Sequence, residues 1–242
     1  TAYTTLFKTG QQLLDSYIIT IFYTITGTIM SLTVMSMFAF VLAQQKFRFR
    51  TIYTFILFFT MLFSGGLVPS YIINVRYLHL KDTVWIFLLP SLVSAYNVII
   101  LRTFIQTTIP DSLFEAAKID GASNFTVFFR IVLPLFKPDL ATIGLFNVVT
   151  RWNDWFTGML YIDNPKLIPL QTLLQRILRN IQFIKDNSQL EGTREAQEIL
   201  ASMPTESTRM AITVIIVIPI LFAYPFFQRY FIEGLTIGSI KG

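Results

Sequence analysis

Two stretches of the sequence place polar and aromatic side chains inside otherwise apolar segments, in combinations suited to binding a carbohydrate. Aromatic faces pack against the C–H surfaces of sugars, while amides and carboxylates bind their hydroxyl groups. Asn147 and Asp154 are two helical turns apart and would share roughly one helix face. We predict that a substrate pathway is lined by Tyr96, Asn97, Asn147, Arg151, Trp152, Asn153, Asp154 and Trp155.

Structural roles compete with this interpretation. A Trp near a helix end commonly anchors the helix at the membrane interface. Arg151 and Asp154 have the i,i+3 spacing of a simple ion pair. Charged side chains in an apolar span are nevertheless expected to face the bundle interior or a wet cavity, where Arg151 would be a counter-charge for an anionic ligand. Both interpretations remain open from the sequence alone.

Other chemistry is limited by composition. The chain contains no Cys and a single His, so neither a thiolate metal site nor a His cluster can form. We therefore expect no metal site and no catalytic residues. The sequence has no phosphate-binding loop of the form GxxxxGK[ST], so we expect this chain to bind no ATP itself.

A second constellation is the polar stretch from Glu115 to Pro134, which interrupts the apolar sequence. Ser112 and Glu115 have the spacing of a capping box at a helix start. Gly121 fits a helix end, where a left-handed residue is required, and Ser123 can start another helical turn. We predict a helix–Gly–helix coupling element over 111–130, attached to a membrane helix and able to transmit force from a cytoplasmic partner. A structural elbow without a partner is the alternative.

The elements that position these residues are membrane helices. Apolar residues make up 53% of the chain and charged residues 14%, compared with roughly a quarter in soluble domains. The apolar runs are too long for strands and lack period-two alternation. Kinks or ends are predicted at Gly65, Gly66, Pro69, Pro90, Pro219 and Pro225. We predict one transmembrane domain over 1–242, with five helical spans at about 17–43, 51–75, 83–104, 136–157 and 209–229.

Charge predicts the orientation. Lys46, Arg48 and Arg50 lie in one short link, which places that link in the cytoplasm. The net charge of +5 then reflects basic loops at a membrane surface, and we expect no nucleic-acid partner. Alternation puts the coupling element inside and a long loop over 158–208 outside, with helices over 169–182 and 194–204. Residues 1–16 fall on the outer side, so we expect a further span before Thr1.

The coupling element carries a motif of specific spacing: Glu-Ala-Ala, three residues, Gly, nine residues, and Ile-x-Leu-Pro. It resembles the EAA signature of the membrane subunits of binding-protein-dependent ABC importers. "WNDWF" and "FIEGLTIGSIKG" are similar to maltose-type carbohydrate permeases, and "PLQTLLQRIL" to the branch that imports oligosaccharides and polysaccharides, including alginate. The residues that fit the EAA pattern are Glu115, Ala116, Ala117, Gly121, Ile131, Leu133 and Pro134.

This resemblance implies the transmembrane fold of a type I ABC importer, with five helices visible of an expected six. It implies a bacterial inner-membrane protein that is surrounded by lipid and pairs with a second homologous permease. Two ATP-binding cassette ATPases, which hold the ATP and Mg, would bind the EAA elements, and an extracytoplasmic solute-binding protein would deliver the glycan. The family's cytoplasmic tail, which reaches the ATPases, would here contain Glu233, Gly234, Gly238 and Lys241.

Three alternatives stay open. An ABC importer for a non-sugar solute also carries an EAA element, but the long outer loop and the Trp-rich span at 136–157 favour sugar. A stand-alone ion-coupled carrier predicts mid-membrane carboxylates and internal repeats, neither of which is clear in this sequence. A membrane enzyme would need a constellation of nucleophile and base that we do not find.

Overall fold

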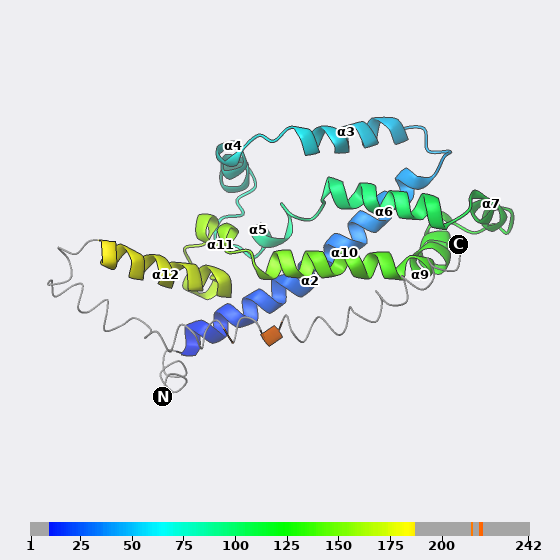
Figure 1. Cartoon of the computed structure of the whole chain (residues 1–242). Coiled ribbons are helices and arrows are strands. Elements are labelled where there is room, and N and C mark those ends of the chain that lie inside the picture. Colours follow the sequence, from blue (N-terminus) through cyan, green and yellow to red (C-terminus); the bar gives the residue numbers. More distant parts are fainter. Residues whose placement is uncertain (1–9, 187–213, 215–217, 220–242) are drawn as a thin grey trace. The chain divides into compact units, whose positions relative to one another are not determined.

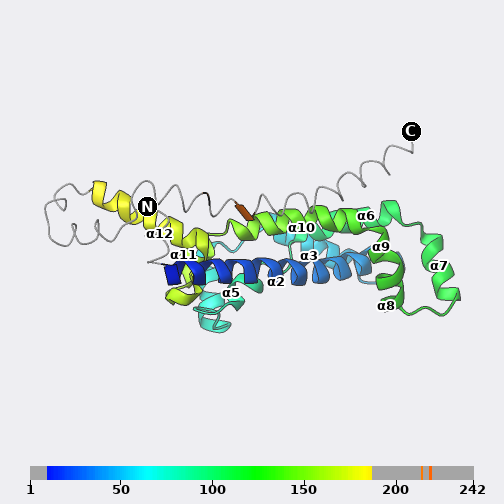
Figure 2. The same ribbon diagram turned by 90° about the horizontal axis from the view of Figure 1, so that it is seen from below.

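The computed structural model describes residues 10–186 together with Val214, Ile218 and Pro219. All regular elements in this described part are helical, and Figure 1 labels the α-helices except α8, which Figure 2 labels. The all-α class predicted from the sequence is confirmed. The elements are α2 (Gly10–Ala43), α3 (Arg50–Leu62), α4 (Leu67–Ile72), η1 (Ile73–Tyr77), α5 (Trp85–Leu88), α6 (Ala95–Thr108), α7 (Asp111–Ile119), α8 (Asn124–Val127), η2 (Phe128–Val132), α9 (Leu133–Leu135), α10 (Lys137–Trp152), α11 (Phe156–Tyr161), η3 (Pro165–Leu167) and α12 (Leu170–Asp186).

Helix α2 contains the first predicted span. Among the described residues it is the one helix that by itself is long and apolar enough to cross a membrane, over Gln11–Ala43. Small hydroxyl side chains let membrane helices approach one another closely. The buried face of α2 carries such side chains at Ser16, Thr20, Thr24, Thr28 and Ser31.

Two bent helix pairs would raise the number of spans in the described residues to three, if each pair is one broken span. The first pair joins Arg50–Leu62 to Leu67–Tyr77 with a bend of 114°. The second joins Asn124–Leu135 to Lys137–Trp152 with a bend of 80°. The first bend follows from Gly66, whose φ of +83° is a conformation that side chains with a Cβ rarely adopt.

The predicted span at 83–104 is also interrupted. Helix α5 ends at Leu88, and α6 begins only at Ala95, with Pro90 between them. The Ser94 hydroxyl caps α6 by accepting a hydrogen bond from the Asn97 backbone N–H at 3.4 Å. The last predicted span, 209–229, lies outside the described residues apart from the three isolated positions named above.

The described residues form two compact units, which α2 and α10 both enter. Unit 2 comprises 25–73 and 88–148, and α3 and α6 lie side by side in it (Figure 1). Figure 2 shows α7, α8 and α9 gathered beyond the C-terminal end of α6. The core of this unit joins α2, α6 and the α7–α9 segment through Met35, Ala39, Phe40, Leu42, Ala43, Leu57, Val98, Leu101, Ile105, Ile109, Ala117, Val127, Phe128, Val132, Phe136 and Ile143.

Unit 1 comprises the described residues of 10–24, 74–87 and 149–186. The Tyr23 ring stacks on Phe87 with centroids 4.6 Å apart, and its hydroxyl donates a hydrogen bond to the Arg151 carbonyl at 2.9 Å. The Leu170 N–H donates to the Thr20 hydroxyl at 2.9 Å, which ties the start of α12 to α2. The helix predicted over 169–182 is therefore confirmed as α12, whereas the one predicted over 194–204 lies outside the described residues.

A hydrogen-bonded clamp joins the 74–83 link to the loop after α11. Asp82 has a φ of +55° and accepts the backbone N–H groups of Asp163 and Asn164 at 2.6 and 2.8 Å. The Lys81 ammonium pairs with the Asp163 carboxylate at 2.8 Å. These contacts hold the two segments of unit 1 together.

Candidate functional site

Helix α7 begins at Asp111, and the capping box expected at Ser112 and Glu115 does not form. Pro110 is the N-cap residue, with an extended backbone and no side-chain cap bond. Ser112 consequently lies one residue inside the helix. The carboxylate of Asp111 stands in the first turn, where a negative charge favours the helix dipole. The Glu115 carboxylate instead pairs with Lys46, in the link that follows α2.

The end of α7 confirms the role predicted for Gly121. Its φ is +75°, in the left-handed region that a glycine adopts without strain. The Gly121 N–H donates to the Lys118 carbonyl at 3.1 Å, and the Ala122 N–H donates to the Ala117 carbonyl at 2.9 Å. These two bonds form a Schellman motif, which satisfies the last carbonyls of the helix and sets the direction in which the chain leaves it.

The chain then enters a second helical segment, as predicted. The Ser123 hydroxyl accepts the Thr126 N–H at 3.2 Å and caps α8, which continues into η2 and α9. Ile131 and Leu133 are half-buried against the core of unit 2, whereas Pro134 is exposed. This half of the EAA motif therefore secures the element to the body of unit 2.

The two alanines of the motif face different surroundings. Ala117 is buried within the core of unit 2, where its small side chain allows α7 to lie close to its neighbours. Ala116 is exposed. Four large apolar side chains of the coupling element are exposed as well: Leu113, Phe125, Phe129 and Ile119, the last at 86%. Exposed apolar groups of this kind are typical of a protein–protein contact surface.

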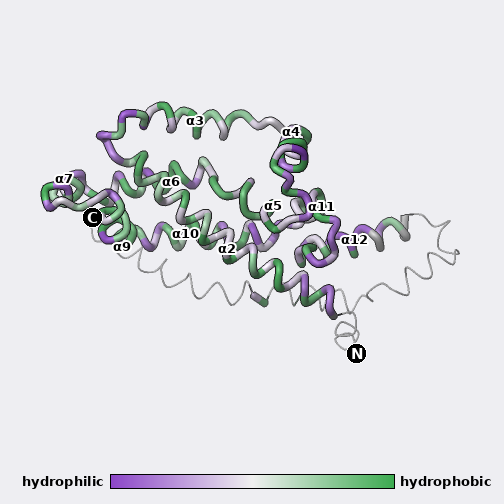
Figure 3. Tube along the Cα trace, turned by 180° about the vertical axis from the view of Figure 1, so that it is seen from behind, coloured by the Kyte–Doolittle hydropathy of each residue, from purple (hydrophilic) through white to green (hydrophobic). Residues whose placement is uncertain are grey.

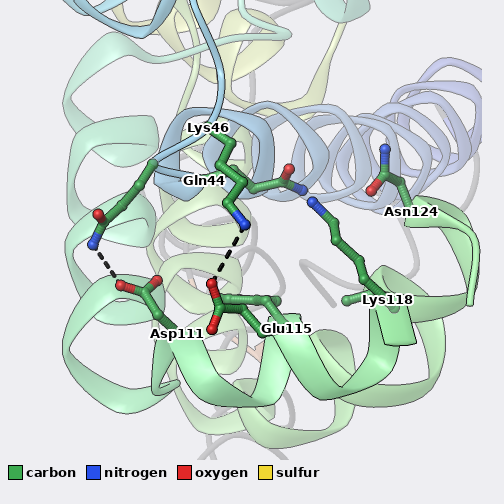
Figure 4. A pocket seen from close by; sticks show the side chains of 9 residues that line it. Gln44, Lys46, Asp111, Glu115, Lys118 and Asn124 are labelled. Carbon is green, nitrogen blue, oxygen red and sulfur yellow. Dashed lines mark hydrogen bonds and ion pairs between the residues drawn. The ribbon is translucent and has the colours of Figure 1, made fainter. Parts of the chain in front are cut away.

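A pocket of about 290 Å³ separates the coupling element from the link that follows α2 (Figure 4). Figure 4 shows Lys46 reaching Glu115, and the two charged groups are 3.3 Å apart. The Gln45 amide donates a hydrogen bond to the Asp111 carboxylate. Both members of the ion pair are mostly exposed, so the pair contributes little stability on its own. The pocket is lined by Gln44, Gln45, Lys46, Asp111, Phe114, Glu115, Lys118, Asn124 and Val127.

Gln45 and Lys46 were not among the site residues predicted from the sequence. The basic composition of their link indicated a membrane side but not a partner. A contact between residues 46 and 115 depends on the packing of the helices between them, and no local pattern reports it.

The structure places two of the predicted pathway residues in buried positions within unit 1. The Arg151 guanidinium donates to the Phe87 carbonyl at 2.7 Å, and the residue is 5% exposed. Trp152 packs against Leu170, with its ring edge-to-face to Tyr17 at 6.1 Å. These contacts are those of residues that hold unit 1 together.

The expectation that Asn147 and Asp154 share a helix face is wrong, because α10 ends at Trp152. The Asn147 amide donates to the Ile143 carbonyl of its own helix at 3.0 Å. The Asp154 carboxylate accepts the Thr157 N–H in the first turn of α11 at 3.0 Å. The two residues also belong to different units.

The remaining pathway candidates divide by exposure. Asn153 is exposed and accepts a hydrogen bond from the Gln171 amide at 3.2 Å. Trp155 is half-buried, with the Arg179 guanidinium 5.5 Å from its ring centroid. Tyr96 is 60% exposed on α6, and its neighbour Asn97 is half-buried. The predicted tail residues Glu233, Gly234, Gly238 and Lys241 lie outside the described residues.

Comparison with known proteins identifies the family. Residues 24–237 match the family described as binding-protein-dependent transport system inner membrane component. The chain is 38% identical over its whole length to the polygalacturonan/rhamnogalacturonan transport system permease protein YtcP of Bacillus subtilis strain 168, and covers 81% of that protein. It is 39% identical to protein LplC of the same strain, again over the whole chain and 78% of the relative.

A solved structure shows the same fold. It is described as the crystal structure of a bacterial ABC transporter involved in the import of the acidic polysaccharide alginate. The TM-score is 0.80 at 33% sequence identity, covering 95% of this chain and 79% of the other. The chain therefore belongs to the binding-protein-dependent transport system inner membrane components, and is a membrane permease subunit of an ABC importer rather than an enzyme.

Proposed function

We propose that this permease imports an acidic oligosaccharide or polysaccharide, such as a uronate-containing glycan. The observation that carries the proposal is the similarity over the whole chain to a permease named for polygalacturonan and rhamnogalacturonan, supported by the likeness to an alginate importer. Both of these names refer to acidic polymers. A stand-alone carrier receives no such support, and a non-sugar cargo is named only for a more distant relative among those compared, at 25% identity.

The proposed assembly contains this subunit, a second homologous permease, two ATPases and a solute-binding protein that delivers the glycan from outside. The ATPases hold the ATP and Mg, and this chain binds neither. The coupling element 111–130 docks on an ATPase with its exposed side chains, among them Leu113, Ile119 and Phe125. Its buried side chains, such as Ala117 and Val127, pass the motion to the core of unit 2.

Within the proposed pathway, the exposed side chains are those most available to a sugar. Tyr96 on α6 offers an aromatic face and Asn153 offers an amide. Arg151 and Trp152 are buried, so we expect them to act mainly on stability. By family resemblance, the tail from Glu233 onward contacts the ATPases.

The cargo can be tested with the reconstituted transporter. The four-subunit complex in lipid nanodiscs is mixed with its binding protein and with oligogalacturonate, alginate oligosaccharide or a neutral maltooligosaccharide. We expect the acidic glycans to stimulate ATP hydrolysis and the neutral one to leave it at the basal rate. Stimulation by the maltooligosaccharide alone would contradict the acidic cargo. Stimulation by none of them, with a complex that hydrolyses ATP, would contradict the carbohydrate assignment within the set tested.

A further inference from the structure

Two arginines lie side by side where α3 begins against α6. The Arg102 guanidinium on α6 has a long contact of 3.5 Å with the Thr54 hydroxyl, and this hydroxyl donates to the Arg50 carbonyl at 2.7 Å. Thr54 therefore connects the Arg102 side chain to the first turn of α3. Arg50 is close enough for the two positive charges to repel each other. Arg48, two residues before Arg50 in the link, is exposed.

This pair of cations lacks a counter-charge within the described part of the chain. The ion pairs found there join Lys46 to Glu115 and Lys81 to Asp163, and no described carboxylate lies within 4.0 Å of Arg50 or Arg102. The Nε atom of Arg102 is buried and has no hydrogen-bond partner among the described residues. Because Nε is enclosed and the two side chains are only half-buried, an anion with several oxygen atoms would be bound by the terminal nitrogens of Arg102 and Arg50.

The surroundings of the pair are those of a membrane–water interface. Figure 3 shows a hydrophilic link leading into a hydrophobic α3. Phe47 and Tyr53 stack with centroids 6.0 Å apart at this junction. The assignment to the cytoplasmic side rests on the proposed function, in which the coupling element faces the ATPases, because Lys46 of the same link contacts Glu115 of that element. Apolar side chains continue exposed along α3 at Ile52, Phe55, Ile56, Phe58, Phe59 and Leu62.

We propose that Arg50 and Arg102 bind the phosphate of an anionic phospholipid in the cytoplasmic leaflet, with the acyl chains against the exposed apolar side chains of α3. Guanidinium groups match phosphate oxygens with paired hydrogen bonds, and basic sites between membrane helices on the cytoplasmic side suit anionic headgroups. The continuity of charged, aromatic and apolar groups along one helix favours a lipid over an acidic side chain of a partner subunit. The proposal is independent of the transported glycan.

The test uses the assembled transporter in a mild detergent, with phosphatidylglycerol as the probe and phosphatidylcholine as the neutral comparison. Native mass spectrometry measures the fraction of complex that retains lipid across a titration. We expect Arg102→Gln to weaken phosphatidylglycerol binding about fivefold, equivalent to about 1 kcal/mol per cation, with no change for phosphatidylcholine. Arg102→Lys keeps the charge and should retain most of the binding. Arg76→Gln removes one exposed cation in η1 and serves as the matched control.

Two outcomes would overturn the proposal. One is unchanged phosphatidylglycerol selectivity in both Arg102→Gln and Arg50→Gln, which would assign the binding to other residues or to a protein partner. The other is competition by inorganic phosphate at concentrations comparable to the lipid, which would indicate a site for the free anion. If the Arg102→Gln complex does not assemble, the lipid binding of Arg50→Gln alone tests the proposal. Arg50 is half-buried in the first turn of α3, so we expect that variant to assemble.

Discussion

Replacing Gly121 tests the backbone conformation of the coupling element without disturbing its packing. A Cβ built on Gly121 would meet no atom within 4 Å, so a side chain there introduces no collision. The cost comes from the backbone alone, because the φ of +75° disfavours a residue with a Cβ by about 1–2 kcal/mol. For Gly121→Val we therefore expect the Schellman turn to open in a fraction of molecules that rises by a factor of about 5–30.

An opened turn changes the direction in which the chain leaves α7, and so the angle between α7 and α8. The coupling element would then no longer present the surface on which the ATPase docks. We expect Gly121→Val to assemble with the second permease but to retain ATPase poorly, or to hydrolyse ATP without stimulation by the loaded binding protein. Gly121→Asn is the matched control, because Asn tolerates the left-handed conformation better than Val does. The assays are ATPase pull-down and phosphate release with and without the loaded binding protein. If Gly121→Val matches the wild type in both assays, the turn is not needed for coupling and the reasoning is refuted.

Three further predictions concern unit 1. Gly158→Ala places a methyl group against Thr172, so we expect the free energy of unfolding to fall by about 1–3 kcal/mol. An unchanged melting temperature of the detergent-solubilised complex would argue against this tight contact. Backbone N–H donors lower the pKa of Asp82 below its ordinary 3.8. The ionised carboxylate therefore stabilises the folded protein at neutral pH, and this stabilisation is lost as the pH falls through the lower folded pKa. Asp82→Asn should show a smaller acid-induced drop in melting temperature than the wild type, and identical pH profiles would contradict this. Arg151→Gln removes the charged donor to the Phe87 carbonyl and should lower the free energy of unfolding by about 1.5–3 kcal/mol. Wild-type stability together with impaired transport would favour a role of Arg151 in the substrate pathway instead.

Local sequence was sufficient where neighbouring residues alone decide the structure. The break after α7 was predictable from Gly121, since no other residue type adopts its backbone conformation so readily. Interruptions near Gly66 and Pro90 were predictable for related reasons. The start of α7 was not predictable in this way, because Ser112 and Glu115 have the residue types and spacing of a capping box but do not form one. Pro110 has an extended backbone and starts the helix two residues earlier than the pattern suggested, so Ser112 is already inside it.

The sequence by itself determined the membrane class, the helical architecture and the EAA element, because apolar length, helix-ending residues and motif spacing act over a few turns of chain. Only the tertiary structure decided the partners of the charged side chains. Glu115 pairs with Lys46, and Arg151 donates to Phe87 across more than sixty positions of sequence. Arg102 lies next to Arg50 without a described acid beside it. Such contacts depend on which helix faces meet, and this is set by the packing of the whole unit rather than by any local pattern.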